Sequence, residues 1–227
     1  MSPYEYYQPP TRFSIIPPVI KNLLIINVLV FLAQQLPGVG EFLERWFALW
    51  PIGSPDTVLT PFGMQRVPSF YPWQLITYAF LHGSFTHLFF NMFALWMFGV
   101  QLENVWGSRR FATYYFACVL GAAIAQLIVM YGSYIPTIGA SGGVYGILLA
   151  FGMMFPNQPI YLYFLFPIKA KWFVLGYALL ELYAGVTGTQ AGVAHFAHLG
   201  GMVIGFILLQ YWRGKLPIKP RRIMYWR

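Results

Sequence analysis

Six long apolar stretches constrain the fold of this chain more than any other feature of its sequence. Most of them approach the ~20 residues that a helix needs to cross a bilayer. Because lipid offers no hydrogen-bond partners to a backbone, helices are the form in which such stretches are stable there. The pattern predicts an all-α membrane protein with one bundle of six transmembrane helices. The stretches cover residues 19–36, 81–102, 110–131, 140–155, 171–187 and 192–212.

The composition excludes a water-soluble enzyme. Hydrophobic residues make up 58% of the chain and charged residues only 9%, against about 25% charged residues in a soluble domain. A chain this apolar is not disordered either, because it buries surface wherever it can. The single cysteine, Cys118, permits no internal disulfide. We expect the lipid bilayer and membrane proteins as partners, and neither nucleic acid nor a cofactor.

The basic residues predict the orientation of the bundle. All but two of the 14 Lys and Arg residues lie around the start of the first stretch, after the last one, or in connections on the same side. Since cytoplasmic segments collect basic residues, both termini are predicted to be cytoplasmic. The two exceptions, Arg45 and Arg66, belong to a long segment on the outer side. We expect the inner membrane of a bacterial cell as the location.

This orientation divides the chain into a cytoplasmic segment 1–18, a membrane domain 19–212 and a basic cytoplasmic tail 213–227. Segment 1–18 has no apolar region beside a small-residue cleavage site, so we expect no cleaved signal peptide. The outer segment, about 37–80, is predicted to be a non-helical loop in the outer headgroup region, where its aromatic rings are favoured. The loop is interrupted by Pro51, Pro55, Pro61, Pro68 and Pro72.

A few polar side chains interrupt the apolar stretches, and each needs a reason, because a charged side chain costs roughly 2.5–3.5 kcal/mol inside a spanning helix. His87 and Asn91 are one turn apart in one stretch, Ser141 begins another, and His195 and His198 lie in the last. All three stretches start from the predicted outer face. Their polar side chains therefore share one layer, on the order of 10 Å deep at 1.5 Å per residue.

Ser141 is the candidate nucleophile of this layer. A helix N-terminus presents unpaired N–H groups and a positive dipole end, which stabilise the oxyanion formed when a serine attacks a carbonyl. Gly139 and Gly142 leave room beside it for a substrate backbone. The stretch 140–155 is also shorter than the ~30 Å hydrocarbon core, so its start is predicted to line a wet cavity.

The base that activates a serine must be a histidine here, since histidines are the titratable groups of suitable pKa in the layer. His198 is preferred to His195, because it heads a face of small residues, Gly201 and Gly205, that lets its helix approach a neighbour closely. Tyr145, one turn below the serine, is expected to pack against the imidazole. His87 and Asn91 are expected to supply further hydrogen-bond donors to the oxyanion.

Taken together, these motifs resemble those of the rhomboid family of intramembrane serine proteases. The resemblance implies a six-helix core, a long first external loop, a Ser–His dyad without a third acid, and cleavage of the transmembrane segments of other proteins. The external loop departs from it at Gln74, where many members have arginine after the tryptophan. The matching residues are His82, His87, Asn91, the stretch Gly99 to Gly107 with Glu103, Gly139, Ser141, Gly142, Tyr145, Ala197, His198, Gly201 and Gly205.

Two other functions fit parts of this pattern. A non-catalytic rhomboid-like protein that binds transmembrane helices is the alternative, although retention of both Ser141 and His198 argues against it. A metal or proton transporter needs ionisable residues along a full path, and the inner halves of 140–155 and 192–212 have none. No metal site is expected, because the outer layers of the three polar stretches carry no carboxylate. The dyad leaves Glu181 unexplained.

Overall fold

The computed structural model describes residues 5–6, 13–60, 63–162, 165–188, 194–220 and 222–224. Each apolar stretch is helical in it, with ends that differ from the predicted ones by a few residues. Of the described helices, α4 and α5 are long and apolar enough to cross a membrane by length and composition alone; six crossings and the orientation of the termini remain predictions. The helices are α1 (Pro18–Gln34), α4 (Phe85–Trp106), α5 (Ser108–Val129), α6 (Ser141–Met154), α7 (Ala170–Thr187) and α8 (His195–Trp212).

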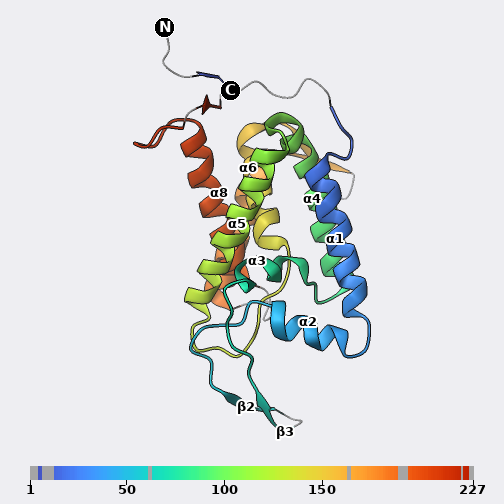
Figure 1. Ribbon diagram of the computed structural model, residues 1–227. Coiled ribbons are helices and arrows are strands. Elements are labelled where there is room, and N and C mark those ends of the chain that lie inside the picture. The colour runs from blue at the N-terminus through green and yellow to red at the C-terminus, as the bar shows by residue number, and fades with distance from the viewer. Residues whose placement is uncertain are drawn as a thin grey trace.

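Helix α6 is the centre of the bundle, in contact with α4, α5, α7 and α8, while α1 packs against α4 (Figure 1). Most α6 side chains are buried, and small residues allow its neighbours to approach. The outward faces of the helices carry large exposed apolar side chains. Such a continuous apolar exterior is unusual for a protein in water and suits contact with lipid. Examples are Leu29, Phe90, Ile128, Leu180 and Phe206.

The segment between α1 and α4 forms one end of the molecule. It holds α2 (Val39–Phe47), a hairpin of β2 (Thr57–Thr60) and β3 (Gly63–Arg66), the short α3 (Gln74–Thr77), and a 3₁₀ turn (Tyr78–Phe80). In Figure 1, α2 lies across the ends of the long helices and the hairpin projects beyond it. The hairpin is antiparallel and pairs Thr57 with Arg66.

The prediction that 37–80 contains no helix is wrong. Helix α2 can form because no proline lies between Pro37 and Pro51, which leaves Val39–Phe47 free of them. Gly38, in a left-handed conformation with φ of 74°, reverses the chain after α1. Leu43 and Phe47 then pack against a small core that includes Trp50 and Leu81.

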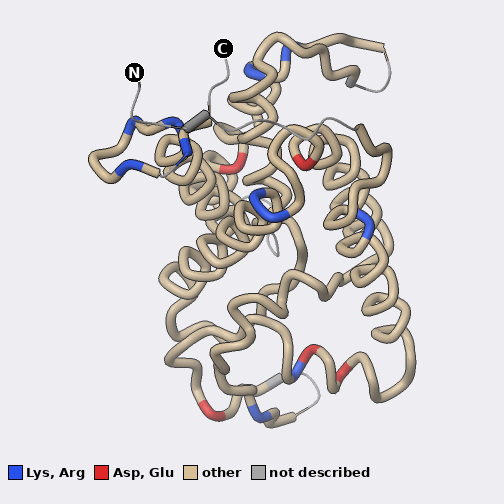
Figure 2. Tube along the Cα trace, turned by 45° about the horizontal axis from the view of Figure 1, so that its top comes forward, with Lys and Arg blue, Asp and Glu red and all other residues tan. Residues whose placement is uncertain are grey.

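Short strands complete the connections. Strands β4 (Pro159–Leu162) and β5 (Phe166–Lys169) form an antiparallel pair between α6 and α7, and β1 (Glu5–Tyr6) pairs in parallel with β6 (Arg222–Ile223). Lys and Arg residues gather at the end opposite the β2–β3 hairpin, and few lie at the hairpin end (Figure 2). The predicted orientation depends on this uneven distribution of Lys and Arg between the two ends of the bundle.

Candidate active site

Ser141 is the first residue of α6, and the chain before it has an unusual backbone. Gly139 has a φ of 123°, a conformation that favours glycine. Its N–H donates to the carbonyl of Tyr78 at 2.9 Å, which fixes the entry to the helix. Helix geometry leaves the N–H groups of Ser141 and Gly142 without an acceptor within α6, whereas the N–H of Gly143 donates to the carbonyl of Ala140 at 3.0 Å. With 14 residues, α6 is about 21 Å long at 1.5 Å per residue, shorter than the hydrocarbon core.

The structure brings Ser141 and His198 together. The serine Oγ lies 2.8 Å from the imidazole Nε2, a hydrogen-bond distance between α6 and α8. His198 is 7% exposed, and Ser141 is half-buried at the rim of the site. His195, the other histidine considered as a base, faces α7 instead, where its Nδ1 contacts Glu181.

Glycines allow the approach of the two helices. A Cβ built on Gly201 would stand 2.0 Å from the backbone oxygen of Gly142, so no larger residue fits there. Gly205, on the same predicted face, lies instead against α5, where a Cβ would meet the hydroxyl of Tyr114 at 2.4 Å. The small face of α8 therefore serves two neighbours, α6 and α5, rather than α6 alone.

Tyr145 lies over the imidazole of His198. The two ring centroids are 4.2 Å apart and their planes differ by 6°, a stacked arrangement. The tyrosine hydroxyl donates to Glu181 Oε1 in a short hydrogen bond. Tyr145 thus holds the imidazole from its face while its polar end is anchored on α7.

His87 lies near the serine on the side of Gly139. A Cβ built on Gly139 would stand 2.7 Å from Nε2 of His87 and 3.8 Å from the Oγ of Ser141, so both side chains border the same point. Asn91 is buried, and its Nδ2 donates to the backbone carbonyl of His87 at 3.0 Å. Among the described residues, no hydrogen bond joins Asn91 to Ser141.

Glu181 is the residue of the site whose part sequence reasoning did not find. Its Oε2 lies 2.6 Å from Nδ1 of His195 and 2.9 Å from Nδ1 of His198. A signal was present, since Glu181 is the sole acidic residue in the six apolar stretches, and an ionisable residue in a span marks a functional site by default. The sequence-based prediction of the site drew only on the three stretches that begin at the outer face, and Glu181 comes from α7.

Among the residues that the structure describes, Glu181, His195 and His198 also form a group that could hold a metal ion, with one ligand atom each within 4.8 Å of one another. Ligand atoms around a tetrahedral zinc stand about 3.3 Å apart, given bonds of about 2.0 Å. The carboxylate here is closer than that to both imidazoles, at 2.6 and 2.9 Å. The distances are those of ion pairs and hydrogen bonds, and a metal ion between these groups would have to separate them.

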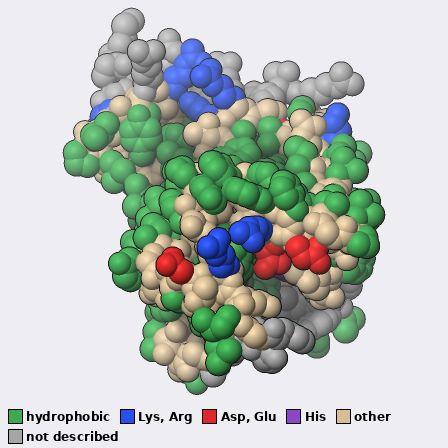
Figure 3. Space-filling view, turned by 60° about the horizontal axis from the view of Figure 1, so that its bottom comes forward, with side chains coloured by type: hydrophobic (Ala, Val, Ile, Leu, Met, Phe, Trp, Pro, Cys, Tyr) green, Lys and Arg blue, Asp and Glu red, His purple; other side chains and the backbone are tan. Residues whose placement is uncertain are grey.

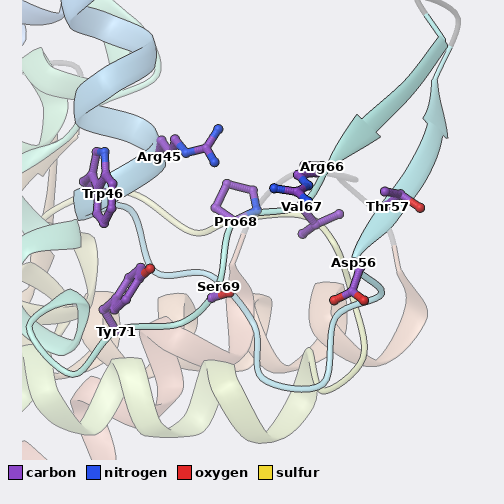
Figure 4. A pocket seen from close by; sticks show the side chains of 9 residues that line it. All are labelled: Arg45, Trp46, Asp56, Thr57, Arg66, Val67, Pro68, Ser69 and Tyr71. Atoms are coloured by element: carbon purple, nitrogen blue, oxygen red, sulfur yellow. The ribbon is translucent and has the colours of Figure 1, made fainter.

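A cavity of about 430 Å³ lies elsewhere, at the hairpin end, and it includes none of the predicted site residues (Figure 4). Trp46 and Tyr71 stack at one side of it, with ring centroids 5.4 Å apart. Figure 3 looks onto this end, where a few basic and acidic side chains lie beside one another among hydrophobic ones. The cavity is lined by Arg45, Trp46, Asp56, Thr57, Arg66, Val67, Pro68, Ser69 and Tyr71.

An apolar helical bundle in which a serine at the start of α6 meets a histidine of α8 is the arrangement of a membrane protein with a candidate serine–histidine site, and comparison with known sequences gives its family. The model of the rhomboid domain matches residues 69–214, which include α4 to α8 and every predicted site residue. The chain therefore belongs to the rhomboid family.

Curated relatives extend the likeness. The chain is 32% identical over 223 residues to "Rhomboid protein 1, mitochondrial" of Saccharomyces cerevisiae, covering 91% of this chain and 57% of that protein. It is 27% identical over 214 residues to the human "Presenilin-associated rhomboid-like protein, mitochondrial", covering 88% and 51%. It thus spans about half the length of these relatives. An Arabidopsis thaliana protein, "RHOMBOID-like protein 6, mitochondrial", is 31% identical over 137 residues, covering 60% and 42%.

The expectation of a bacterial inner membrane is wrong, because these relatives are eukaryotic proteins named as mitochondrial. The physical reason for the error is that hydropathy and charge asymmetry report a bilayer and its sides. Neither property identifies the organelle to which that bilayer belongs.

Proposed function

We propose that this chain is an intramembrane serine endopeptidase that cleaves transmembrane segments of other proteins near their external membrane boundary. The single observation that carries the proposal is the 2.8 Å separation of Ser141 Oγ and His198 Nε2 at the start of a buried helix. One hydroxyl and one imidazole in hydrogen-bond reach form the minimal machinery of acyl transfer by a serine.

The chemistry proceeds in two halves. The Ser141 hydroxyl gives its proton to His198 Nε2 while its oxygen attacks the substrate carbonyl carbon, and the imidazolium then gives that proton to the leaving amine as the peptide bond breaks. Water, deprotonated by the same imidazole, hydrolyses the acyl-enzyme and regenerates the serine. The oxyanion of each tetrahedral intermediate is stabilised by the N–H groups at the start of α6 and by the side chains of His87 and Asn91.

The remaining parts of the proposal concern topology and place. Six crossings with both termini on one side agree with the six helices and with the basic residues at one end of the bundle (Figure 2). We place the protein in a mitochondrial membrane, as the names of its relatives suggest. The proposed partners of the protein are transmembrane protein substrates and the lipid bilayer.

A fluorophosphonate probe tests the proposal directly, because it reacts with activated serines. The purified protein in detergent is expected to label at Ser141, and the label is expected to vanish in Ser141→Ala. A folded wild-type protein that does not label would favour the non-catalytic alternative, a rhomboid-like protein that binds transmembrane helices. Fractionation of cells that express the chain tests the mitochondrial location separately.

A further inference from the structure

Glu181 is an ionisable side chain buried in the apolar helix α7, and the Ser–His dyad alone gives it no role. It lies on α7, whose buried stripe otherwise consists of Ala170, Val174 and Ala184. A carboxylate at such a place is costly unless partners meet it. Glu181 has three: the Tyr145 hydroxyl on one oxygen and the Nδ1 atoms of His195 and His198 at the other.

The geometry points to Glu181 as the positioning residue of the proposed protease, the third member of a Ser141–His198–Glu181 relay contributed by α6, α8 and α7. This inference rests on the proposed function and adds to it a carboxylate that acts through His198. The serine lies 2.8 Å from Nε2 of His198, and the carboxylate lies 2.9 Å from Nδ1 of the same ring.

The two ring nitrogens decide what the imidazole can do. His198 can accept the serine proton only if Nε2 is unprotonated, which requires the proton of the neutral ring to be on Nδ1. A carboxylate beside Nδ1 favours that tautomer and stabilises the imidazolium formed during attack. The contact is close but oblique, since it does not meet the angle of a well-formed hydrogen bond. Its effect is therefore chiefly electrostatic.

The other two partners hold the carboxylate in place. His195 Nδ1 is 2.6 Å from the same oxygen that approaches His198. Tyr145 binds the opposite oxygen and stacks on the ring of His198. Because each partner comes from a helix other than α7, the carboxylate couples the docking of α7 to the state of the base. A purely structural anchor would dock α7 without affecting the chemistry.

The test compares Glu181→Gln, Glu181→Asp and Val174→Ala in the full chain. Glutamine keeps the shape of the side chain but carries no charge, and its amide can donate to Nδ1 and so favour the wrong tautomer. We expect Glu181→Gln to lower kcat by about 10²–10⁴-fold, with KM and the melting temperature nearly unchanged. Glu181→Asp should recover part of kcat, and the rate of fluorophosphonate labelling should follow kcat.

Val174→Ala is the matched control, because Val174 lies in the same buried stripe of α7, two turns from Glu181, and packs on Gly152 of α6. It should lower the melting temperature and leave kcat near that of the wild-type protein. Should Glu181→Gln not fold, Tyr145→Phe keeps the ring stacked on His198 and removes only the anchor of the carboxylate. It is expected to lower kcat about tenfold without a change in KM.

The results separate this inference from the proposed function. A labelled, active wild-type protein together with a kcat of Glu181→Gln within twofold of wild type overturns the inference and leaves the protease standing. The inference is overturned too if Glu181→Gln and Val174→Ala lose kcat in the same proportion to their fall in melting temperature, because the loss then reflects stability alone. A wild-type protein that neither labels nor cleaves overturns both.

Discussion

Gly201 of α8 lies directly against the backbone of Gly142 in α6, and the space between them excludes even a methyl group. A Cβ on Gly201 would stand 2.0 Å from the carbonyl oxygen of Gly142. Contacts of this kind let two helices approach until short side chains meet across them. The separation of the serine and the imidazole, one turn away along α8, depends on that approach.

The first prediction concerns this packing. Gly201→Ala should force α6 and α8 apart, lower the free energy of unfolding by about 1–3 kcal/mol, and reduce proteolysis strongly. Gly176→Ala is the control, because a Cβ on Gly176 in α7 meets nothing within 4 Å. In a helix interior that change should stabilise slightly, by up to about 1 kcal/mol. Thermal unfolding in detergent, with a cleavage assay, measures both; equal behaviour of the two variants would contradict the role of close packing.

The second prediction concerns the dyad. Because a hydroxyl and its base act as a unit, Ser141→Ala, His198→Ala and the double variant should fall to a similar residual rate of cleavage. His195→Ala should retain more activity than His198→Ala, since His195 has no contact with the serine among the described residues. A loss at His195→Ala but not at His198→Ala would reverse the choice of base. Unchanged melting temperatures are required for the comparison.

The third prediction concerns the oxyanion. If Asn91 and His87 donate to the charge that develops on the substrate oxygen, Asn91→Ala and His87→Ala should each lower kcat by up to about 10²–10³-fold with KM nearly unchanged. Steady-state kinetics on a purified transmembrane substrate measures the two constants. A change in KM alone would instead assign these side chains to substrate binding.

The fourth prediction concerns a buried carboxylate away from the site. Glu103, at the end of α4 opposite His87, accepts the N–H groups of Val19 and Ile20 at 2.9 Å each, and so caps the start of α1. Glu103→Gln should lower the free energy of unfolding by about 1.5–3 kcal/mol, the contribution of a charge-assisted hydrogen bond.

Glu41→Gln provides the comparison for Glu103, since Glu41 is exposed in the first turn of α2. That change should stay within about 0.5 kcal/mol, as surface changes do. Denaturant unfolding in mild detergent gives both values. A Glu103 variant as stable as the Glu41 variant would mean that the start of α1 does not need this cap.

The sequence was sufficient to predict the six helices, because hydropathy depends only on local composition. The meeting of Ser141 and His198 was predictable as well, because glycines mark where helices approach. Helix α2 was not predicted, because the expectation of a loop rested on Pro51 and the later prolines, all of which follow that helix. Glu181 was missed because hydropathy gives the extent of α7 but not its rotation about its own axis. Only the packing of α7 on α6 and α8 turns that side chain toward the histidines.

The last prediction concerns the substrate and follows from the position of the serine. A transmembrane helix makes its backbone hydrogen bonds internally, so its carbonyls do not reach Ser141 until a few residues unwind. Gly or Pro near the outer end of the substrate makes unwinding easier, by ~1 and ~3 kcal/mol relative to Ala. Space at the start of α6 is narrow, since even a Cβ on Gly139 would collide with His87. A small residue is therefore expected before the scissile bond.

Single-pass proteins should accordingly be cut near their external membrane boundary, and the rate should fall when helix-breaking residues there are replaced by leucine. Cleavage of such a substrate in liposomes, followed by mass measurement of the products, locates the site. Leucine replacements in the inner half of the same substrate helix serve as the control and should leave the rate unchanged. A cut in the inner half, or indifference to leucine at the outer end, would be incompatible with a serine held at the start of a short helix.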